Sequence, residues 1–353
     1  MNYNFILLLI AGSFLTSLVP VSSIRPGSEK APGRLAHKPL CIGFYNVENL
    51  FDTLDDPISD DQEFTPNGKS HWTRDKYAKK ISNLAKVIRA MNDGKGPDIL
   101  GLSEVENKHV LVDLLSDPQL KKIDYGIVHH DSPDMRGIDV AMIYKKNVFT
   151  VLQQKAFPVD ISQYDDHPTR DILMVTGISR NDTFMIFLNH WPSRRGGREA
   201  SEPRRIAAAT VLKKATDSIL SFNPGAKIIA MGDFNDNPTD KSLAQVLKVS
   251  DSPGPAGKNS LYNCDVNFDW KKGEGSEFYR GDWSRFIQII VTSSLIMNQT
   301  GPGGTFTDIH LFRPDWLLVS DTTYKQMIPK RMFQENNTIG FSDHLPVYIE
   351  LKN

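Results

Sequence analysis

The stretch Ile228-Ile229-Ala230-Met231 is apolar at every position, and a second stretch, Phe286-Ile287-Gln288-Ile289-Ile290-Val291, is apolar at all but one. A strand with one solvated face alternates apolar and polar residues, so strands of this kind are covered on both faces. Similar runs alternate with helical patterns along the chain. The sequence therefore predicts an α/β fold, a layered sandwich in which two sheets pack together and helices lie outside.

The apolar runs and turn signals divide the chain into expected elements. Helices are predicted at 74–92, 108–116 and 203–221, and strands at 40–45, 99–102, 140–144, 183–188, 227–231, 287–292, 316–319 and 345–351. Segment 251–280 is rich in Gly, Pro and Asn and has few periodic apolar positions. We expect this segment to be a long loop that faces the substrate or moves.

The first residues have a different character from the rest of the chain. Residues 1–23 carry two apolar stretches followed by small polar residues, which is typical of a secretory signal peptide, although no Lys or Arg precedes the apolar core. An uncleaved anchor helix is the alternative. Residues 24–39 read as a flexible leader, and residues 40–353 as one large domain. A secreted or periplasmic protein with no stable membrane span after cleavage is expected.

Charge and cysteine content limit the classes of partner and fold. Lys and Arg number 41 against 42 Asp and Glu, so no global basic field draws in nucleic acid and any polyanion must be recognised locally. Only Cys41 and Cys264 are present, which allows one disulfide but favours two buried, inert thiols. No coiled-coil pattern or exposed apolar stripe is visible, so a monomer is expected.

Polar residues recur where the apolar strands end. Taken singly, each could be a turn residue or a helix cap. Strand ends on one edge of a sheet converge, however, so the repetition indicates a site. Its candidate members are Asn46, Glu48, Glu104, Asp139, Asn189, His190, Asp233, Asn235, Asp343 and His344.

The residue types in this set suit a hard metal ion and a phosphate. Glu104, with Asn46 or Glu48 and Asp343, offers the oxygen ligands that Mg²⁺ or Mn²⁺ prefers, and no Cys/His cluster has zinc spacing. The basic run that follows His190 contains Arg194 and Arg195, whose guanidinium groups suit phosphate oxygens. A solvated basic loop is the alternative for that run.

Five motifs in this order resemble the endonuclease/exonuclease/phosphatase superfamily, which includes deoxyribonucleases, abasic-site endonucleases, neutral sphingomyelinases and inositol-polyphosphate 5-phosphatases. They are FYNVENL at 44–50, PDILGLSE at 97–104, NHWPSR at 189–194, GDFND at 232–236 and SDHLPV at 342–347. The combination looks most like a secreted bacterial branch. The resemblance implies a four-layered sandwich of two mixed β-sheets flanked by helices, and dependence on a divalent metal.

The resemblance also implies roles for individual residues. Glu104 is similar to the principal metal ligand, supported by Asn46 and Glu48; the other counterparts are His190 oriented by Asp139, Asp233 with Asn235 for the attacking water and phosphate, and Asp343 with His344 as the terminal pair. Asn189, Arg194 and Arg195 are expected at the phosphate. The implied reaction is in-line attack of water on phosphorus. Either His344 or Asp233 serves as the base.

The chain departs from the family pattern at one position. The acid that orients the terminal His is expected at 287, where this sequence has Ile287, which cannot accept a hydrogen bond. Asp315 is the predicted substitute, and Asp282 is a weaker candidate. Three functions stay open: a phosphodiesterase acting on DNA or RNA, a phosphatase or phospholipase acting on inositol or lipid phosphates, and a non-catalytic protein that binds phosphate ligands.

Overall fold

The first of two large sheets is mixed and contains the N-terminal and C-terminal strands of the domain. The computed structural model of the chain describes residues 38–250, 260–267, 274–296, 305–334 and 338–352. The first sheet has the strand order β13-β16-β1-β2-β4-β3. β1 and β2 are parallel, and the other neighbours are antiparallel. The bounds are β1 Leu40–Leu50, β2 Ile99–Val105, β3 Tyr125–His129, β4 Asp139–Lys145, β13 Thr305–Leu311 and β16 Val347–Lys352.

The second sheet is also mixed and has the strand order β5-β6-β7-β8-β12-β9. Here β7 and β8 are the parallel pair. The bounds are β5 Thr150–Phe157, β6 Ile172–Ser179, β7 Asp182–His190, β8 Lys227–Asp233, β9 Leu261–Asn263 and β12 Ile287–Thr292. Two small hairpins complete the strands of the described residues: β10 Glu277–Tyr279 with β11 Asp282–Ser284, and β14 Leu318–Asp321 with β15 Gln326–Pro329.

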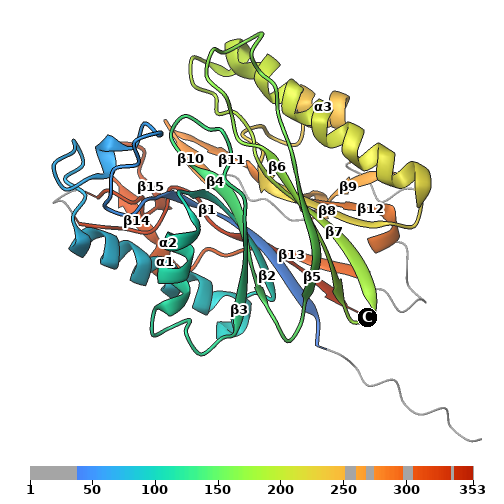
Figure 1. Ribbon diagram of the computed structural model, residues 1–353, viewed down its shortest axis with the longest axis horizontal. Helices are drawn as coiled ribbons and strands as arrows, with labels where there is room; N and C mark the ends of the chain where they lie inside the picture. The colour runs from blue at the N-terminus through green and yellow to red at the C-terminus, as the bar shows by residue number, and fades with distance from the viewer. Residues whose placement is uncertain (1–37, 251–259, 268–273, 297–304, 335–337, 353) are drawn as a thin grey trace, which may run out of the picture. The chain divides into compact units, whose positions relative to one another are not determined.

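The two sheets pack face to face, and the helices cover their outer faces (Figure 1). Phe44 and Met142 of the first sheet meet Ile186 and Met231 of the second in one apolar core. Helices α1 (Arg74–Gly94) and α2 (Lys108–Ser116) cover the outside of the first sheet, and α3 (Arg198–Phe222) covers the second. The predicted α/β sandwich of two mixed sheets flanked by helices is therefore confirmed.

Short helical turns link these elements. They are η1 Gln62–Phe64, η2 Ser242–Leu247, η3 Cys264–Asn267, η4 Ser293–Leu295 and η5 Asp315–Leu317. The strand predicted at 316–319 was wrong in its first half, because Pro314 leads into the turn η5 and the strand β14 begins only at Leu318. β14 pairs with β15 in a small hairpin and joins neither large sheet.

Segment 251–280, predicted as a loop, contains ordered pieces. Its described part includes β9, η3 and β10, while 251–259 and 268–273 lie outside the described residues. The predicted signal peptide and most of the leader, residues 1–37, also lie outside them. Cys41 and Cys264 are both free and buried, as expected. No helix in the described part of the chain is long and apolar enough to span a membrane.

Candidate active site

Strand ends from both sheets meet at one edge of the sandwich. The parallel strands β1 and β2 carry Asn46 and Glu104 toward their carboxyl ends there, and the antiparallel strand β16 begins there after His344. In the second sheet, β7 and β8 end in register at His190 and Asp233. Parallel strands carry their carboxyl ends to the same edge, and an antiparallel neighbour begins there, so this convergence follows from the strand order.

Asn46 joins the two sheets at this edge. Its Nδ2 donates hydrogen bonds to Glu104 Oε1 at 3.2 Å and to Asp233 Oδ2 at 2.9 Å. Its Oδ1 accepts the backbone N–H of Glu48 at 2.9 Å. Asn46 is fully buried, so one amide holds two carboxylates from different sheets at a fixed separation.

Glu104 occupies a bulge at the end of β2. The pairing with β4 shifts between Ser103 and Val105, and Glu104 has a φ of 62°, in the left-handed region that non-glycine residues seldom adopt. A bulge turns a side chain away from the regular pleat and is frequent beside active sites. The redirected carboxylate accepts the N–H of Asn49 at 2.9 Å through Oε2 and lies 3.9 Å from His190 Nε2 through Oε1.

His190 is a buried and neutral imidazole. Burial first, then the positive charges of Arg170 and Arg136, lower the pKa of His190 well below its usual value. Arg170 is fixed beside it, because its Nε donates to the carbonyl of His190 at 3.2 Å and its Nη1 to Asp134 at 2.8 Å. His190 Nδ1 is buried and has no hydrogen-bond partner among the described residues.

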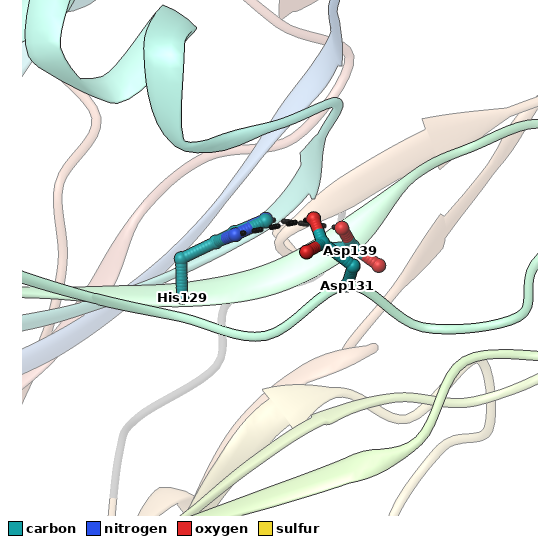
Figure 2. A group of neighbouring side chains, drawn as sticks. All are labelled: His129, Asp131 and Asp139. Carbon is teal, nitrogen blue, oxygen red and sulfur yellow. Dashed lines mark ion pairs between the residues drawn. The ribbon is translucent and has the colours of Figure 1, made fainter.

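Asp139 contacts His129 and not His190, which corrects the predicted pairing. Figure 2 shows the ring of His129, at the end of β3, directed toward Asp139 at the start of β4 and toward Asp131. His129 Nε2 lies 3.0 Å from Asp139, Nδ1 lies 3.6 Å from Asp131, and Asp139 also accepts the N–H of Ser132 at 2.7 Å. The adjacent, antiparallel ends of β3 and β4 place these two side chains together.

His344 lies between three carboxylates. Its Nε2 is 3.5 Å from Asp233, 3.7 Å from Asp343 and 4.0 Å from Glu277. Burial favours the neutral ring, but the negative charges of Asp233, Asp343 and Glu277 raise the pKa of His344 to about 9. The two catalytic candidates thus differ in charge at neutral pH, with His344 protonated and His190 neutral.

Asp315 does not orient His344. It is exposed on η5, and the acids within 4.0 Å of His344 in the described residues are the three just named. Asp282, on β11, is exposed as well. The residue that sequence reasoning missed is Glu277, whose β10 strand forms a backbone bridge to His344. Glu277 lies in the segment predicted to be a loop facing the substrate, and that expectation was the only signal for it.

Asp343 and Glu48 are linked by Arg331. The Arg331 side chain lies 3.1 Å from Asp343 and 3.5 Å from Glu48. Glu48 also accepts the N–H of Met332. Burial and the nearby charge of Asp343 raise the pKa of Glu48 to about 7. Glu48 therefore sits behind Asp343 and supports it through a shared cation.

Asp233 and Asn235 form the turn that follows β8. Asp233 Oδ1 accepts the N–H of Asn235 at 3.0 Å, and Asn235 Nδ2 donates to the carbonyl of Trp191 at 2.9 Å. Asn235 has a φ of 50°, so the turn is strained as well as hydrogen-bonded. Both side chains are held in place at the site edge by these hydrogen bonds.

The basic loop after His190 is mainly structural, which corrects the predicted phosphate contacts. Arg194 donates to Asp240 at 2.6 Å and to Asp236 at 3.1 Å, and its guanidinium lies 4.5 Å from the centre of the Phe286 ring. Asn189 is fully buried, and its amide bonds the backbone carbonyls of Phe187 and Met231.

Three further arginines of this region are paired with acids, namely Arg198 with Asp240, Arg204 with Asp165 and Arg205 with Asp236. Arg195 is the exposed cation of the predicted set, and no ion pair holds it in the described structure. This run is therefore better described as a basic loop that leads into helix α3 than as a phosphate site. Most of its arginines are paired with acids and are not simply solvated.

The oxygen donors at this edge fit a divalent cation. Glu104 and Asp343 offer carboxylates, the donor chemistry of Mg²⁺ or Mn²⁺, whereas Asn46 presents its Nδ2 to Glu104 and Asp233 and its Oδ1 to the N–H of Glu48. One ligand atom from each of Glu277, Asp343 and His344 lies within 4.8 Å of the others. The predicted metal residues Glu104 and Asp343 therefore suit such an ion by their chemistry, whereas Asn46 is a hydrogen-bond donor to the carboxylates and Glu48 lies behind Asp343.

Comparison of the sequence with protein families gives one match, described as the Endonuclease/Exonuclease/phosphatase family, over residues 41–353. The chain belongs to this family. The match includes every candidate site residue, from Asn46 to His344. No curated protein sequence matches the chain.

Several solved structures share the fold of the chain. Truncated TDP2 of Caenorhabditis elegans aligns with a TM-score of 0.55 at 15% identity, covering 89% of this chain and 98% of that one. A mannosyl-6-phosphatase of Bacteroides thetaiotaomicron gives 0.55 at 17% identity, with 88% and 99% covered. The human Nocturnin catalytic domain with bound sulfate gives 0.52 at 14% identity, with 90% and 97% covered. At these identities the likeness shows the fold alone.

Proposed function

We propose that the chain is a divalent-metal-dependent hydrolase of phosphate esters. The observation that carries the proposal is the pair of buried imidazoles flanking the carboxylates that Asn46 holds together. His190 Nε2 lies 3.9 Å from Glu104, and His344 Nε2 lies 3.5 Å from Asp233. One neutral and one protonated imidazole beside oxygen donors are the acid–base groups that hydrolysis of a phosphate ester requires. Membership of the family supports the same reaction class.

The charge of His344 supports one of the two mechanistic versions. Asp233, fixed by Asn46 and by the N–H of Asn235, accepts a proton from the attacking water. The water oxygen forms the new bond to phosphorus as the bond to the leaving oxygen breaks. His344 is protonated, so it contacts the phosphoryl oxygens and gives its proton to the leaving oxygen. A base role for His344 would require it first to lose that proton.

Glu104 and Asp343 would hold the Mg²⁺ or Mn²⁺ ion, and the Asn46 amide would keep Glu104 in place. When bound, the ion neutralises phosphate charge. Arg331 lies beside this metal site, because its half-exposed guanidinium contacts Asp343 at 3.1 Å. The protein's own contribution is to keep these donors in place through the Asn46 and Asn49 hydrogen bonds.

The pairing of the loop arginines favours a small phosphoester over a nucleic acid. Arg194, Arg198, Arg204 and Arg205 are engaged with acids and offer little free positive charge to a polyanion. Both kinds of ligand occur among the structural neighbours, since one is a mannosyl-6-phosphatase and D. rerio TDP2 was solved with a single-strand DNA product. The latter aligns with a TM-score of 0.54 at 15% identity, covering 89% of this chain and 99% of that one.

Hydrolysis assays with and without EDTA test the proposal. The substrates are p-nitrophenyl phosphate, bis-p-nitrophenyl phosphate, mannose 6-phosphate, an inositol phosphate, sphingomyelin, plasmid DNA and RNA. We expect activity that requires added Mg²⁺ or Mn²⁺, is abolished by EDTA, and is absent from the H190A/H344A double variant. Turnover equal to that of the double variant on every substrate, with phosphate ligands still bound, would establish the non-catalytic binding protein instead.

We also propose that the protein is exported, with residues 1–23 as a cleaved signal peptide. The apolar run and the small residues that follow it support this proposal. N-terminal sequencing of the protein from the periplasmic fraction or medium of an expressing bacterium tests it. A start near residue 24 is expected, and an intact Met1 in the cytoplasmic fraction would contradict it.

A further inference from the structure

The family pattern is broken at position 287, but Glu277 supplies a carboxylate beside His344. We infer that Glu277 is the residue that orients His344, in place of an acid at position 287. This inference rests on the proposed hydrolase function. Glu277 is a positioning residue in this account, because it acts through the imidazole of His344 and not on the substrate.

The backbone fixes Glu277 beside His344. Glu277 is the first residue of β10 and forms an antiparallel bridge with His344, and the N–H of Leu345 donates to the carbonyl of Ser276 at 2.7 Å. These contacts put the two side chains next to each other, with Glu277 Oε1 4.0 Å from His344 Nε2. The Glu277 side chain is 17% exposed, so solvent screens the pair only weakly.

Position 287 lies opposite Asp233, which is 3.5 Å from the His344 ring, but carries an apolar side chain. Ile287 is paired directly with Asp233 across β12 and β8, and its N–H donates to Ser276 Oγ at 3.0 Å. Ser276 therefore contacts position 287 directly and precedes Glu277 in the chain. The acid near His344 thus lies on the small hairpin strand β10 and not on β12, and the two segments are joined by the Ser276–Ile287 hydrogen bond.

The other two acids near His344 are engaged elsewhere. Asp233 accepts hydrogen bonds from Asn46 and from the N–H of Asn235, and Asp343 pairs with Arg331 at 3.1 Å. In the described part of the chain, the Glu277 carboxylate has no hydrogen bond or ion pair other than the one with His344. It is therefore the acid that is free to hold the ring.

A double-mutant cycle tests the inference. We expect E277Q to lower kcat on the best substrate by roughly 100-fold with KM nearly unchanged, and E277D to recover part of the loss. In an H344A background E277Q should cause no further loss, because a residue that acts through His344 has nothing left to position. An equal loss in both backgrounds, or E277Q activity equal to that of the unmodified chain, would overturn the inference.

Metal dependence separates this role from that of a metal ligand. E277Q should leave the Mg²⁺ concentration for half-maximal activity unchanged, whereas removal of a ligand would raise it at least tenfold. A tenfold rise would assign Glu277 to the metal and reject the positioning role.

A measurement that does not depend on activity keeps the inference testable on its own. Long-range ¹H–¹⁵N spectra of the histidine rings, with His344 assigned by its loss in H344Q, should show a shift of the His344 ring nitrogens in E277Q. If the unmodified chain has no activity but the ring signals shift, the hydrolase proposal fails and the contact stands. If the chain is active and the signals are unmoved, the inference fails and the hydrolase proposal stands.

Discussion

Asn46 donates a 2.9 Å hydrogen bond to Asp233, and through it an amide on the first sheet fixes a carboxylate on the second. The same Nδ2 holds Glu104 at 3.2 Å. Two carboxylates would otherwise repel each other across this edge, so the site depends on one neutral donor between them. Asn46 therefore contributes both to the contact between the two sheets and to the chemistry of the site.

Replacing Asn46 by Asp should damage catalysis more than folding. The variant puts a third carboxylate where a donor stood, so we expect kcat/KM to fall by roughly 100-fold, which corresponds to about 2.7 kcal/mol of transition-state stabilisation. Steady-state kinetics at saturating Mg²⁺ measure it. Asn263→Asp is the matched control, because Asn263 is also a buried amide, bonded to Gln288, on the edge strand β9. A similar kinetic loss in both variants would contradict the special role of Asn46.

An acid restored at position 287 should compensate for the loss of Glu277. Ile287 and Asp233 are directly opposite in the antiparallel pair, so their side chains leave the same face about 5 Å apart. We expect E277Q/I287D to be roughly tenfold more active than E277Q. E277Q/I287N, which adds a polar group of similar size without the charge, should give no recovery. Equal activity of the two double variants would rule out the compensation.

Much of the fold could be predicted from the sequence, because the core strands and helices have clear patterns of apolar residues. Helices α1 and α2 begin at the predicted residues, and β8 and β12 carry the two apolar runs from which the sandwich was inferred. β5 was missed because it is an edge strand with mostly exposed residues and no apolar stripe. Edge strands are held by one neighbour, and that neighbour is not visible in a local window.

The site residues could be predicted from the sequence where a polar side chain directly follows an apolar strand. Asn46, Glu104, His190, Asp233 and His344 meet as expected. What the sequence could not reveal is the choice of partner: Asp139 pairs with His129, Arg194 with Asp240, and His344 with Glu277. Such pairings depend on turns and on three-residue strands, which carry no periodic signal.

Loss of Arg205 should destabilise the fold and spare the chemistry. The Arg205 side chain is fully buried, with Nε 2.7 Å from Asp236, so R205M leaves a buried carboxylate without its closest cation. We expect the free energy of unfolding to fall by about 3–5 kcal/mol, with KM of the folded fraction within about twofold of the original. Urea denaturation and steady-state kinetics measure the two effects. R195A, at an exposed cation, should change stability by less than about 0.5 kcal/mol. A large rise in KM for R205M with little loss of stability would contradict the structural role and indicate that this loop binds the substrate phosphate.

Stability in EDTA should fall as pH rises through the titration of His344. The folded-state pKa of about 9 lies above the usual value of 6.5, so the folded state binds this proton more tightly than the unfolded chain does. The stabilisation is fully present below about pH 6.5 and is lost as pH rises through 9. Its size is on the order of 3 kcal/mol, from 1.36 kcal/mol per pKa unit. Urea denaturation at pH 6, 7.5 and 9.5 should show this loss in the unmodified chain and a smaller one in H344Q. Parallel pH profiles for the two proteins would show that the three carboxylates do not hold His344 in its charged form.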